Sequence, residues 1–425
     1  MVSAAANKEG AATVAAFPLT SSHLRIEPAS QKTEGNFHLG YRRWLDGLRG
    51  VAILLVLGCH LGPLPGGFLG VDVFFVLSGF LITSLLMEEW QTTGFIRLKQ
   101  FYLRRALRLL PAFVLLLFLC GLSILWLPSA RERWARGREI AVAACYLSNW
   151  PMLHRTSMPL LGHTWSLSVE EQFYIFWPTL LYSMLRLRLS RRLILSLVCC
   201  GIGASALLRL GLYYWHQSHG TDRMTMIYRL YRGLDTRADA LLAGCLLGLL
   251  AAWDLLPKSR RFVRWTGAAS LNCLVYLVYL ARCGDYYDSQ FYHGLFTVVA
   301  LMTAVLLAHL LSAPARFATR ILESAPLVGT GRISYSLYLF HAPIIHALIP
   351  GCAYLGLAVS PNLGYAAFIL LTLGLSFLAA LLSYHFLERP CLRLKDRLRP
   401  RTAVNPLAPL PAESHKPLNS VQAVA

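Results

Sequence analysis

Long apolar runs alternate with short polar segments along most of this 425-residue chain. Each run approaches the roughly 20 residues that an α-helix needs to cross the hydrocarbon core of a bilayer. We therefore predict an all-α fold, a polytopic membrane bundle of about ten transmembrane helices. The predicted spans are residues 45–61, 68–87, 109–127, 164–185, 193–214, 234–253, 265–281, 291–311, 333–349 and 364–386.

The charges in the connecting segments orient these helices. Cytoplasmic loops carry an excess of Lys and Arg, so the side with the basic segments, and with it both termini, is predicted to be cytoplasmic. An acidic loop, residues 283–289, falls on the other side. The loop 128–163 disagrees, because it places arginines on the predicted outer side. The basic segments are residues 97–108, 186–192, 258–264 and 388–401.

Three segments are predicted not to span. Residues 95–110 place their arginines near one stripe, which predicts an amphipathic helix lying on the inner surface of the membrane. Residues 1–40 and 401–425 are predicted to be disordered cytoplasmic ends. The remaining residues, 41–400, are predicted to form the membrane domain.

The composition supports a membrane protein and argues against other classes. Hydrophobic residues make up 56% of the chain, and the net charge is +19. The basic residues sit in short loops, so the expected partner is the lipid bilayer and not nucleic acid. The ten cysteines show neither a CxxC pair nor a metal-ligand spacing, so we expect no metal site.

Arg49 and His60 lie near opposite ends of the first predicted span. Eleven helical steps make three turns plus about 20°, so the two side chains share one face and are separated by about 16 Å along the axis. Ionisable residues within membrane spans usually face a bundle interior or a wet cavity. The simpler interpretations are that Arg49 snorkels to the inner headgroups and that His60 is solvated at the outer end.

Carboxylates are expected at the depth of His60. Asp72 lies near the outer end of the second span, and Glu170 and Glu171 lie near the outer end of the fourth. A neutral histidine can accept a proton, and a nearby carboxylate would fix its tautomer. Adjacent residues point about 100° apart, so at most one of the two glutamates is expected to face His60. The alternative for Asp72 is a structural pairing with an arginine.

Arginines gather on the opposite, inner side. Arg49, Arg105 and Arg108 are predicted to lie there, and guanidinium groups suit the geometry of phosphate. This layout predicts a phosphorylated ligand at the inner face, with an extended arm that rises to the histidine. The simpler interpretation of the stripe that holds Arg105 and Arg108 is a surface for lipid headgroups.

The motifs together resemble the acyltransferase-3 family of integral membrane O-acyltransferases. LDGLRGVAILLVLGCH keeps the arginine of the family, ten intervening residues and the histidine. The resemblance covers about residues 41–400. The other motifs are GGFLGVDVFFVLSGFLITSLL, FYLRRALRLLPAF, TWSLSVEEQFYIFWP, ISYSLYLFHAPI and YHFLERP.

This resemblance implies ten helices and transfer of an acyl group, usually acetyl, from cytoplasmic acyl-CoA to a hydroxyl of a sugar, polysaccharide or lipid-linked glycan. It implies a multi-pass protein of the bacterial inner membrane that binds no permanent cofactor, with acyl-CoA as donor substrate. Some members add an esterase-like C-terminal domain, which we expect to be absent here. A proton-coupled transporter or flippase of a glycan-related solute remains the alternative.

The resemblance also implies roles for particular residues. Arg49 and His60 correspond to the essential pair of the family, and Arg105 with Arg108 to its basic pair. We expect His60 to be the catalytic base, oriented by Glu170 or Asp72, and the three arginines to bind acyl-CoA. Two further positions, in the motifs around the fourth and ninth spans, are predicted to contact the acceptor. They are Trp165 and His341.

Overall fold

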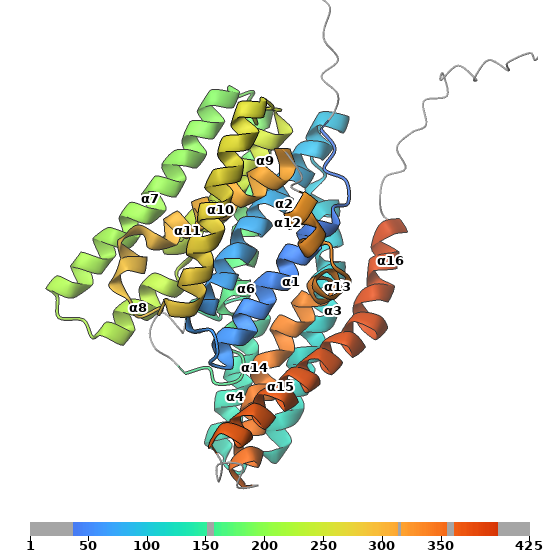
Figure 1. The fold of residues 1–425 in the computed structure, drawn as a ribbon. Helices are drawn as coiled ribbons and strands as arrows, with labels where there is room; N and C mark the ends of the chain where they lie inside the picture. Colours follow the sequence, from blue (N-terminus) through green and yellow to red (C-terminus); the bar gives the residue numbers. More distant parts are fainter. Residues whose placement is uncertain (1–36, 151–156, 313–315, 355–360, 398–425) are drawn as a thin grey trace, which may run out of the picture. The chain divides into compact units, whose positions relative to one another are not determined.

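The computed structural model describes residues 37–150, 157–312, 316–354 and 361–397 (Figure 1). All the regular structure in these residues is helical. The segments predicted to be disordered, 1–40 and 401–425, lie outside the described residues apart from residues 37–40. The description below therefore concerns the predicted membrane domain.

Each apolar run folds as a long helix, as the hydrophobic pattern predicts. Ten helices correspond to the ten predicted spans within a few residues at most ends. They are α1 (Arg43–His60), α2 (Leu69–Thr93), α3 (Leu98–Leu122), α6 (Trp165–Arg186), α7 (Arg191–Ser218), α9 (Leu234–Ala252), α10 (Arg260–Cys283), α11 (Phe296–Ser312), α14 (Ser334–Tyr354) and α15 (Pro361–Ser383).

Several of these helices are suited to crossing a bilayer, and the chain is an integral multi-pass membrane protein. Within the described residues, five helical stretches are long and apolar enough by length and composition. The figure of ten crossings and the cytoplasmic placement of both termini stay predictions. The five stretches are Pro65–Thr93, Leu98–Trp126, Arg191–Ser218, Phe291–Ser312 and Gly364–Leu394.

The prediction of a separate surface helix at residues 95–110 is wrong. These residues are the first half of α3, which continues through Pro111 to Leu122. Leucine and arginine are both good helix formers, so nothing local ends the helix at residue 110. The Tyr335 hydroxyl donates to the Leu109 carbonyl, which lies just before the proline. The basic stripe is therefore part of the bundle and does not lie flat beneath it.

Shorter helices fill the connections. The segment 128–163, interpreted from the sequence as a loop, contains α4 (Ala130–Ala144), whose start is capped reciprocally by Ser129 and Glu132. The others are α8 (Arg223–Arg232), α12 (Arg316–Leu322), α13 (Ala325–Arg332), α16 (Arg389–Arg397), the 3₁₀ turns η1 (Pro65–Phe68), η2 (Ser123–Trp126) and η3 (Gly162–Thr164), and the π-helical turns η4 (Phe291–Leu295) and η6 (Tyr384–Glu388).

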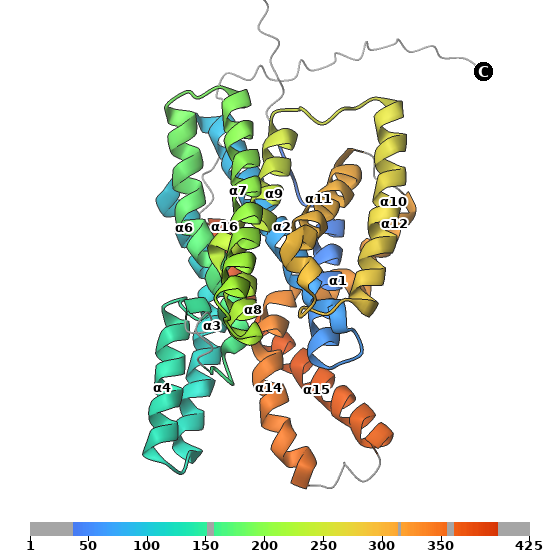
Figure 2. The same cartoon turned by 90° about the vertical axis from the view of Figure 1, so that its left-hand side faces the viewer.

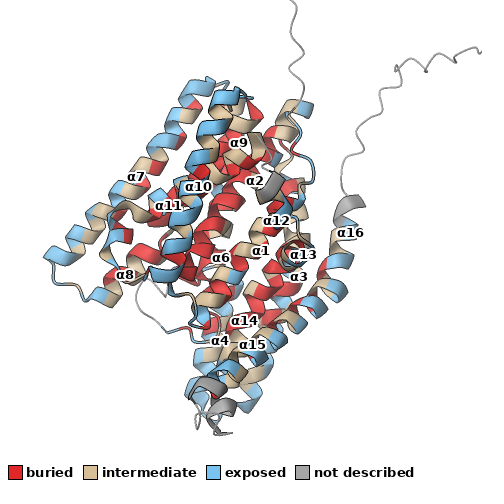
Figure 3. Cartoon of the chain, in the orientation of Figure 1, coloured by how far each residue is buried: buried red, intermediate tan, exposed pale blue. Residues whose placement is uncertain are grey.

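Helices α2 and α9 are both largely buried and pack closely on one another (Figures 1 and 3). A Cβ atom on Gly79 would overlap the carbonyl oxygen of Leu241, and one on Gly244 would overlap that of Val76. Small residues at such crossings let helix backbones approach within a membrane, where packing contributes much of the association. The close approach of α2 and α9 fixes one wall of the candidate site.

The opposite side of the site is built by α3, α6 and α14. Helix α14 contacts both α3 and α15, while α6 packs on α2. In the view of Figure 2, α3 and α6 lie to the left of α1, and α14 and α15 lie below it. Side chains from distant parts of the chain thus converge beside α1.

Candidate functional site

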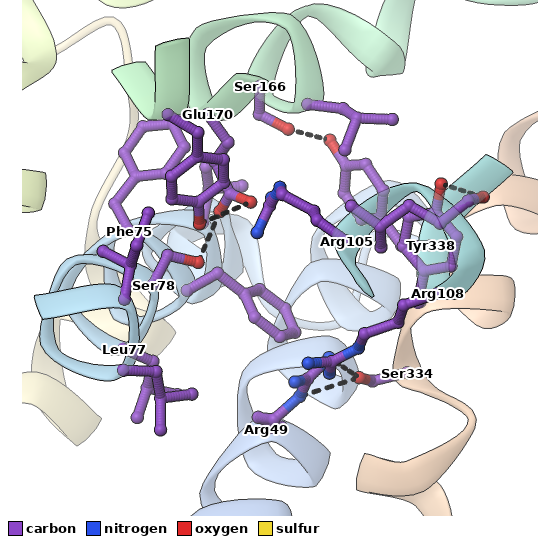
Figure 4. A pocket seen from close by; sticks show the side chains of 18 of the residues that line it. Arg49, Phe75, Leu77, Ser78, Arg105, Arg108, Ser166, Glu170, Ser334 and Tyr338 are labelled. Carbon is purple, nitrogen blue, oxygen red and sulfur yellow. Dashed lines mark hydrogen bonds between the residues drawn. The ribbon is translucent and has the colours of Figure 1, made fainter. Parts of the chain in front are cut away.

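A cavity of about 150 Å³ lies between α1, α2, α3, α6 and α14. Its apolar wall comes mainly from α2, including Phe75 and Leu77. Its polar groups come mainly from the other helices, with Ser78 of α2 among them (Figure 4). A cavity with an apolar wall and a few convergent polar groups is typical of a ligand site.

The three arginines predicted to bind a phosphorylated ligand all line this cavity. Arg49 comes from α1, while Arg105 and Arg108 are three residues apart on α3 and so share a face. The sequence places the two helices far apart, and the tertiary fold brings their guanidinium groups to one place (Figure 4).

The arginines differ in their partners. Arg105 binds both carboxylate oxygens of Glu171, with its Nη2 atom 2.7 Å from Oε1, and it lies 3.4 Å from the ring centroid of Tyr174. Arg49 donates to the Ser334 hydroxyl at 3.3 and 3.4 Å. Arg108 has no hydrogen bond or ion pair within the described residues. The charge that acts most strongly on Arg108 is the like charge of Arg49.

No carboxylate within the described residues forms an ion pair with Arg49 or Arg108. Glu388 acts on both electrostatically, but its carboxylate accepts a hydrogen bond from Ser336 at 2.5 Å. Two guanidinium groups that share a cavity without a counter-ion form an electropositive site. Such a site can bind a ligand with two or more negative oxygens.

Glu170 and Glu171 take different partners, as expected for adjacent helical residues. Glu171 binds Arg105, whereas Glu170 lines the cavity and accepts hydrogen bonds from Ser78 at 3.0 Å and from Tyr174 at 3.5 Å. Neither carboxylate contacts His60. Glu170 therefore does not orient His60 in this structure, contrary to the prediction.

His60 lies in a cluster of three histidines. Its ring centroid is 4.8 Å from that of His341, which in turn is 5.3 Å from that of His163. The Nδ1 atom of His60 is 3.0 Å from the Val56 carbonyl oxygen. Because a carbonyl can only accept, Nδ1 carries the proton and Nε2 is left as the acceptor. A backbone carbonyl thus sets the tautomer that the sequence assigned to a carboxylate.

Tyr338 joins the histidine cluster to the cavity. Its side chain lines the cavity, and its hydroxyl donates to the His163 carbonyl oxygen at 2.6 Å and accepts from the Ser166 hydroxyl at 2.5 Å. Its ring lies 5.6 Å from that of His341. The sequence did not single out Tyr338 or His163, although Tyr338 lies in the motif ISYSLYLFHAPI and His163 directly precedes the motif TWSLSVEEQFYIFWP.

Asp72 does not face His60, so the prediction that it orients the histidine is wrong. It forms an ion pair with Arg237 of α9 at 2.5 Å, and neither side chain is exposed. The sequence left this structural pairing open as the alternative. An arginine in any later apolar run could be the partner, and no local pattern selects Arg237, which lies in the sixth predicted span.

Neither Trp165 nor His341, the two residues predicted to contact the acceptor, lines the cavity. Trp165 is buried, with its ring 6.3 Å from that of Phe75 and 4.9 Å from that of Tyr231, and its contact with an acceptor stays a prediction. His341 is fully buried in the histidine cluster, and its Nε2 atom has no partner within the described residues. Its contact with His60 places it closer to the chemistry than predicted.

Within the described part of the chain, no group of three or more His, Cys, Asp or Glu side chains could hold a metal ion. The groups that the described residues bring to the cavity and the histidine cluster are guanidinium, imidazole, hydroxyl and, at Glu170, carboxyl.

Comparison with known proteins agrees with the motifs. The acyltransferase-3 family, described as an acyltransferase domain, matches residues 42–381. An O-acetyltransferase of Staphylococcus aureus strain MSSA476, so named provisionally, is 36% identical over 363 residues, which are 82% of this chain and 57% of that protein. The peptidoglycan O-acetyltransferase OatA of Listeria monocytogenes is 34% identical over 362 residues, which are 81% of this chain and 55% of that protein. The chain spans about half the length of these curated relatives. No solved structure matches significantly.

Proposed function

This chain belongs to the acyltransferase-3 family, and on that premise we propose that it is a membrane O-acyltransferase. The proposed reaction moves an acyl group, acetyl in the first instance, from cytoplasmic acyl-CoA to a hydroxyl of a glycan. The observation that carries the proposal is a cavity with two guanidinium groups that form no ion pair within the described residues, joined through Tyr338 to a histidine cluster.

The arginine end of the cavity suits the donor. Arg49 and Arg108 repel one another, and the phosphates of CoA would replace that repulsion with charge-assisted hydrogen bonds. Arg105 already binds Glu171, so its larger role is to hold α3 against α6 and to support Tyr174. Donor binding then depends more on Arg49 and Arg108 than on Arg105.

The histidine end suits the transfer step. His60 presents Nε2 as a proton acceptor, because its Nδ1 atom is bonded to the Val56 carbonyl. In the proposed step His60 takes the proton of the acceptor hydroxyl, whose oxygen attacks the thioester carbonyl. The carbon–sulfur bond then breaks, and the CoA thiolate leaves and takes up a proton. General base catalysis of this kind contributes about 10²- to 10⁴-fold to rate.

The acceptor class is proposed from the relatives. The Listeria monocytogenes protein is named a peptidoglycan O-acetyltransferase, and a protein of Bacillus subtilis carries the same activity provisionally in its name. We propose for this chain a polysaccharide or lipid-linked glycan as acceptor, at a bacterial plasma membrane. Acyl-CoA and this glycan are then its substrate partners.

The test is release of free CoA thiol from acetyl-CoA by the purified full chain when a glycan acceptor is added. His60→Ala should abolish release while the protein stays folded, because His60 has little packing to lose at the end of α1. His219→Ala, an exposed histidine on the connection after α7, is the control and should be active. A transporter or flippase would move solute across proteoliposomes without releasing thiol, and that result would refute the proposal.

Geometry supplies two sharper variants. Inserting one alanine between Val56 and Leu57 would rotate His60 by about 100° relative to Arg49. Transfer should be lost although both residues remain. Arg49→Lys should also be impaired, because an ammonium group cannot reproduce the two-pronged geometry of a guanidinium. Substantial activity in the insertion variant would show that the shared face has no role.

A further inference from the structure

Arg232, at the end of α8, stands apart from its neighbouring arginines. Arg229 binds both carboxylate oxygens of Asp235, at 2.9 and 2.5 Å. Arg237 pairs with Asp72, and Arg223 donates to the Tyr287 carbonyl. Within the described residues, Arg232 has no hydrogen bond and no ion pair.

The isolation of Arg232 is costly for the folded chain. Its Nε and Nη1 atoms are shut away from solvent without a hydrogen-bond partner, while the side chain as a whole keeps some exposure. Burial lowers the pKa of Arg232, because the charged form loses water without gaining a carboxylate. A buried donor on a charged group that goes unmet costs its full desolvation energy, and an anion at the exposed part of this guanidinium would offset part of that cost.

Aromatic rings surround this cation. The guanidinium carbon lies 4.2 Å from the ring centroid of Tyr228. The phenols of Tyr231, Tyr286 and Tyr292 also act on the charge of Arg232. Tyrosine rings combine an apolar face with a polar tip, and they suit contact with a ligand that has both, such as a sugar. A cation among such rings suits a sugar that carries a negative group.

Arg232 does not line the cavity that holds Arg49 and Arg108. Its charge acts on Tyr338, whose hydroxyl donates to the His163 carbonyl. The ring of Tyr231, next to Arg232 in the chain, contacts Phe68, which follows the end of α1 that carries His60. Arg49 and Arg108 line the cavity, and Tyr338 lines the same cavity. A ligand at Arg232 is therefore a different one from the donor.

We propose that Arg232 binds an anionic group of the acceptor, and that the acceptor is an acidic glycan. The group is a carboxylate of the sugar or a phosphate of a lipid carrier, since both offer oxygens to a guanidinium fork. This proposal rests on the proposed function, because it assigns the second substrate of the same site. It makes Arg232 a determinant of acceptor specificity.

The test compares glycan fragments of alternating N-acetylglucosamine and N-acetylmuramic acid with the same fragments as methyl esters. Binding to the purified full chain is measured by calorimetry, apart from any turnover. The wild-type chain should bind the acid more tightly than the ester. Arg232→Gln should weaken binding of the acid about tenfold or more and leave binding of the ester unchanged. Arg229→Gln, one turn away and already paired with Asp235, is the matched control and should bind both as the wild type does.

A lipid diphosphate-linked disaccharide, with its carboxylate esterified, distinguishes the two sources of charge. If Arg232→Gln weakens only this ligand, the anionic group is the phosphate of the carrier. Equal binding of all three ligands by the wild type and Arg232→Gln overturns the proposal. Arg232-dependent binding without release of CoA thiol from acetyl-CoA would instead overturn the proposed transfer reaction and leave this inference standing.

Discussion

Two clusters of charge lie inside the helical bundle, and they differ in whether each charge has a partner. Between α2, α7 and α9, Asp72 pairs with Arg237 and Asp239 pairs with Arg209, and none of the four side chains is more than 1% exposed. In the cavity, Arg49 and Arg108 repel one another, and no carboxylate of the described residues forms an ion pair with either.

The difference separates a structural use of charge from one that serves a ligand. Burying a charge is costly unless a partner compensates it, so the α2–α7–α9 cluster holds its helices together once it has formed. The cavity cluster keeps its cost in the free protein, and only a bound anion can remove it. The same residue types thus take opposite roles, and pairing tells them apart.

The largest expected effect is on the paired cluster. Asp72→Asn leaves the buried guanidinium of Arg237 without a counter-ion, which should cost about 3–5 kcal/mol of stability. Thermal denaturation in detergent would measure it. Asp72→Leu combined with Arg237→Met should recover most of the loss, because no charge then stays buried alone. If Asp72→Asn folds like the wild type and only turnover falls, the paired cluster is functional and the comparison fails.

The cavity cluster should respond in the opposite way. Arg108→Gln removes a repulsion, so thermal stability should stay the same or rise slightly. The apparent KM for acetyl-CoA should rise about tenfold or more, as expected when a charged hydrogen bond to phosphate is lost. Arg104→Gln is a matched control from the same helix, because Arg104 contacts Glu89 and does not line the cavity. An unchanged KM in Arg108→Gln would contradict donor binding at this end.

Donors with and without the 3′-phosphate would show which phosphate Arg108 meets. Loss of that phosphate should cost the wild type more than it costs Arg108→Gln. If removing the 3′-phosphate raises the KM equally in both proteins, Arg108 does not contact this phosphate. The same measurement with Arg49→Lys would then test contact with the diphosphate.

A smaller effect is expected at the link between the cavity and the histidines. Tyr338→Phe removes the hydroxyl that joins Ser166 to the His163 carbonyl, which should cost about 1 kcal/mol of stability. We expect kcat to fall several-fold while the KM for acetyl-CoA stays the same, because the proposed site for the donor phosphates is at Arg49 and Arg108. Steady-state kinetics would separate the two. A change in KM alone would place Tyr338 in donor binding.

The smallest effect concerns Glu139 on α4, outside the spanning helices. One of its carboxylate oxygens accepts from the backbone amides of Leu160 and Leu161, just before the turn that carries His163. Burial raises the pKa of Glu139 above its ordinary value, so the folded state holds a proton that the unfolded state has already lost. Stability should therefore fall as the pH rises from the unfolded pKa through the folded one.

Glu139→Gln should abolish this part of the pH dependence, because the amide oxygen can still accept from both backbone groups and does not titrate. Glu139→Ala should weaken the turn at every pH and lower kcat through His163. Denaturation midpoints between pH 4 and pH 8 would test both variants. A pH slope that persists in Glu139→Gln would assign it to another group.

The sequence by itself determined the helices and the family of this protein. A run of about 20 apolar residues must form a helix in a bilayer, because no other local structure satisfies its backbone groups there. The sequence also identified Arg49, Arg105 and Arg108 as one group, since all three lie on the predicted inner side and in motifs of the family. It did not show that the predicted surface helix and the third span are one helix. Leucine and arginine both continue a helix, so no local signal near residue 110 decides whether it ends there.

Only the tertiary structure decided which charges are partners. Asp72 and Glu170 look alike in sequence, as acids near the predicted outer ends of apolar runs. Asp72 meets Arg237, which is 165 residues away, whereas Glu170 meets Ser78 beside a cavity. Electrostatic attraction depends on the distance between charges in space, and sequence separation does not determine that distance. For the same reason, only the packing of the helices shows that His341 lies beside His60. The motif that contains His341 does not predict this contact.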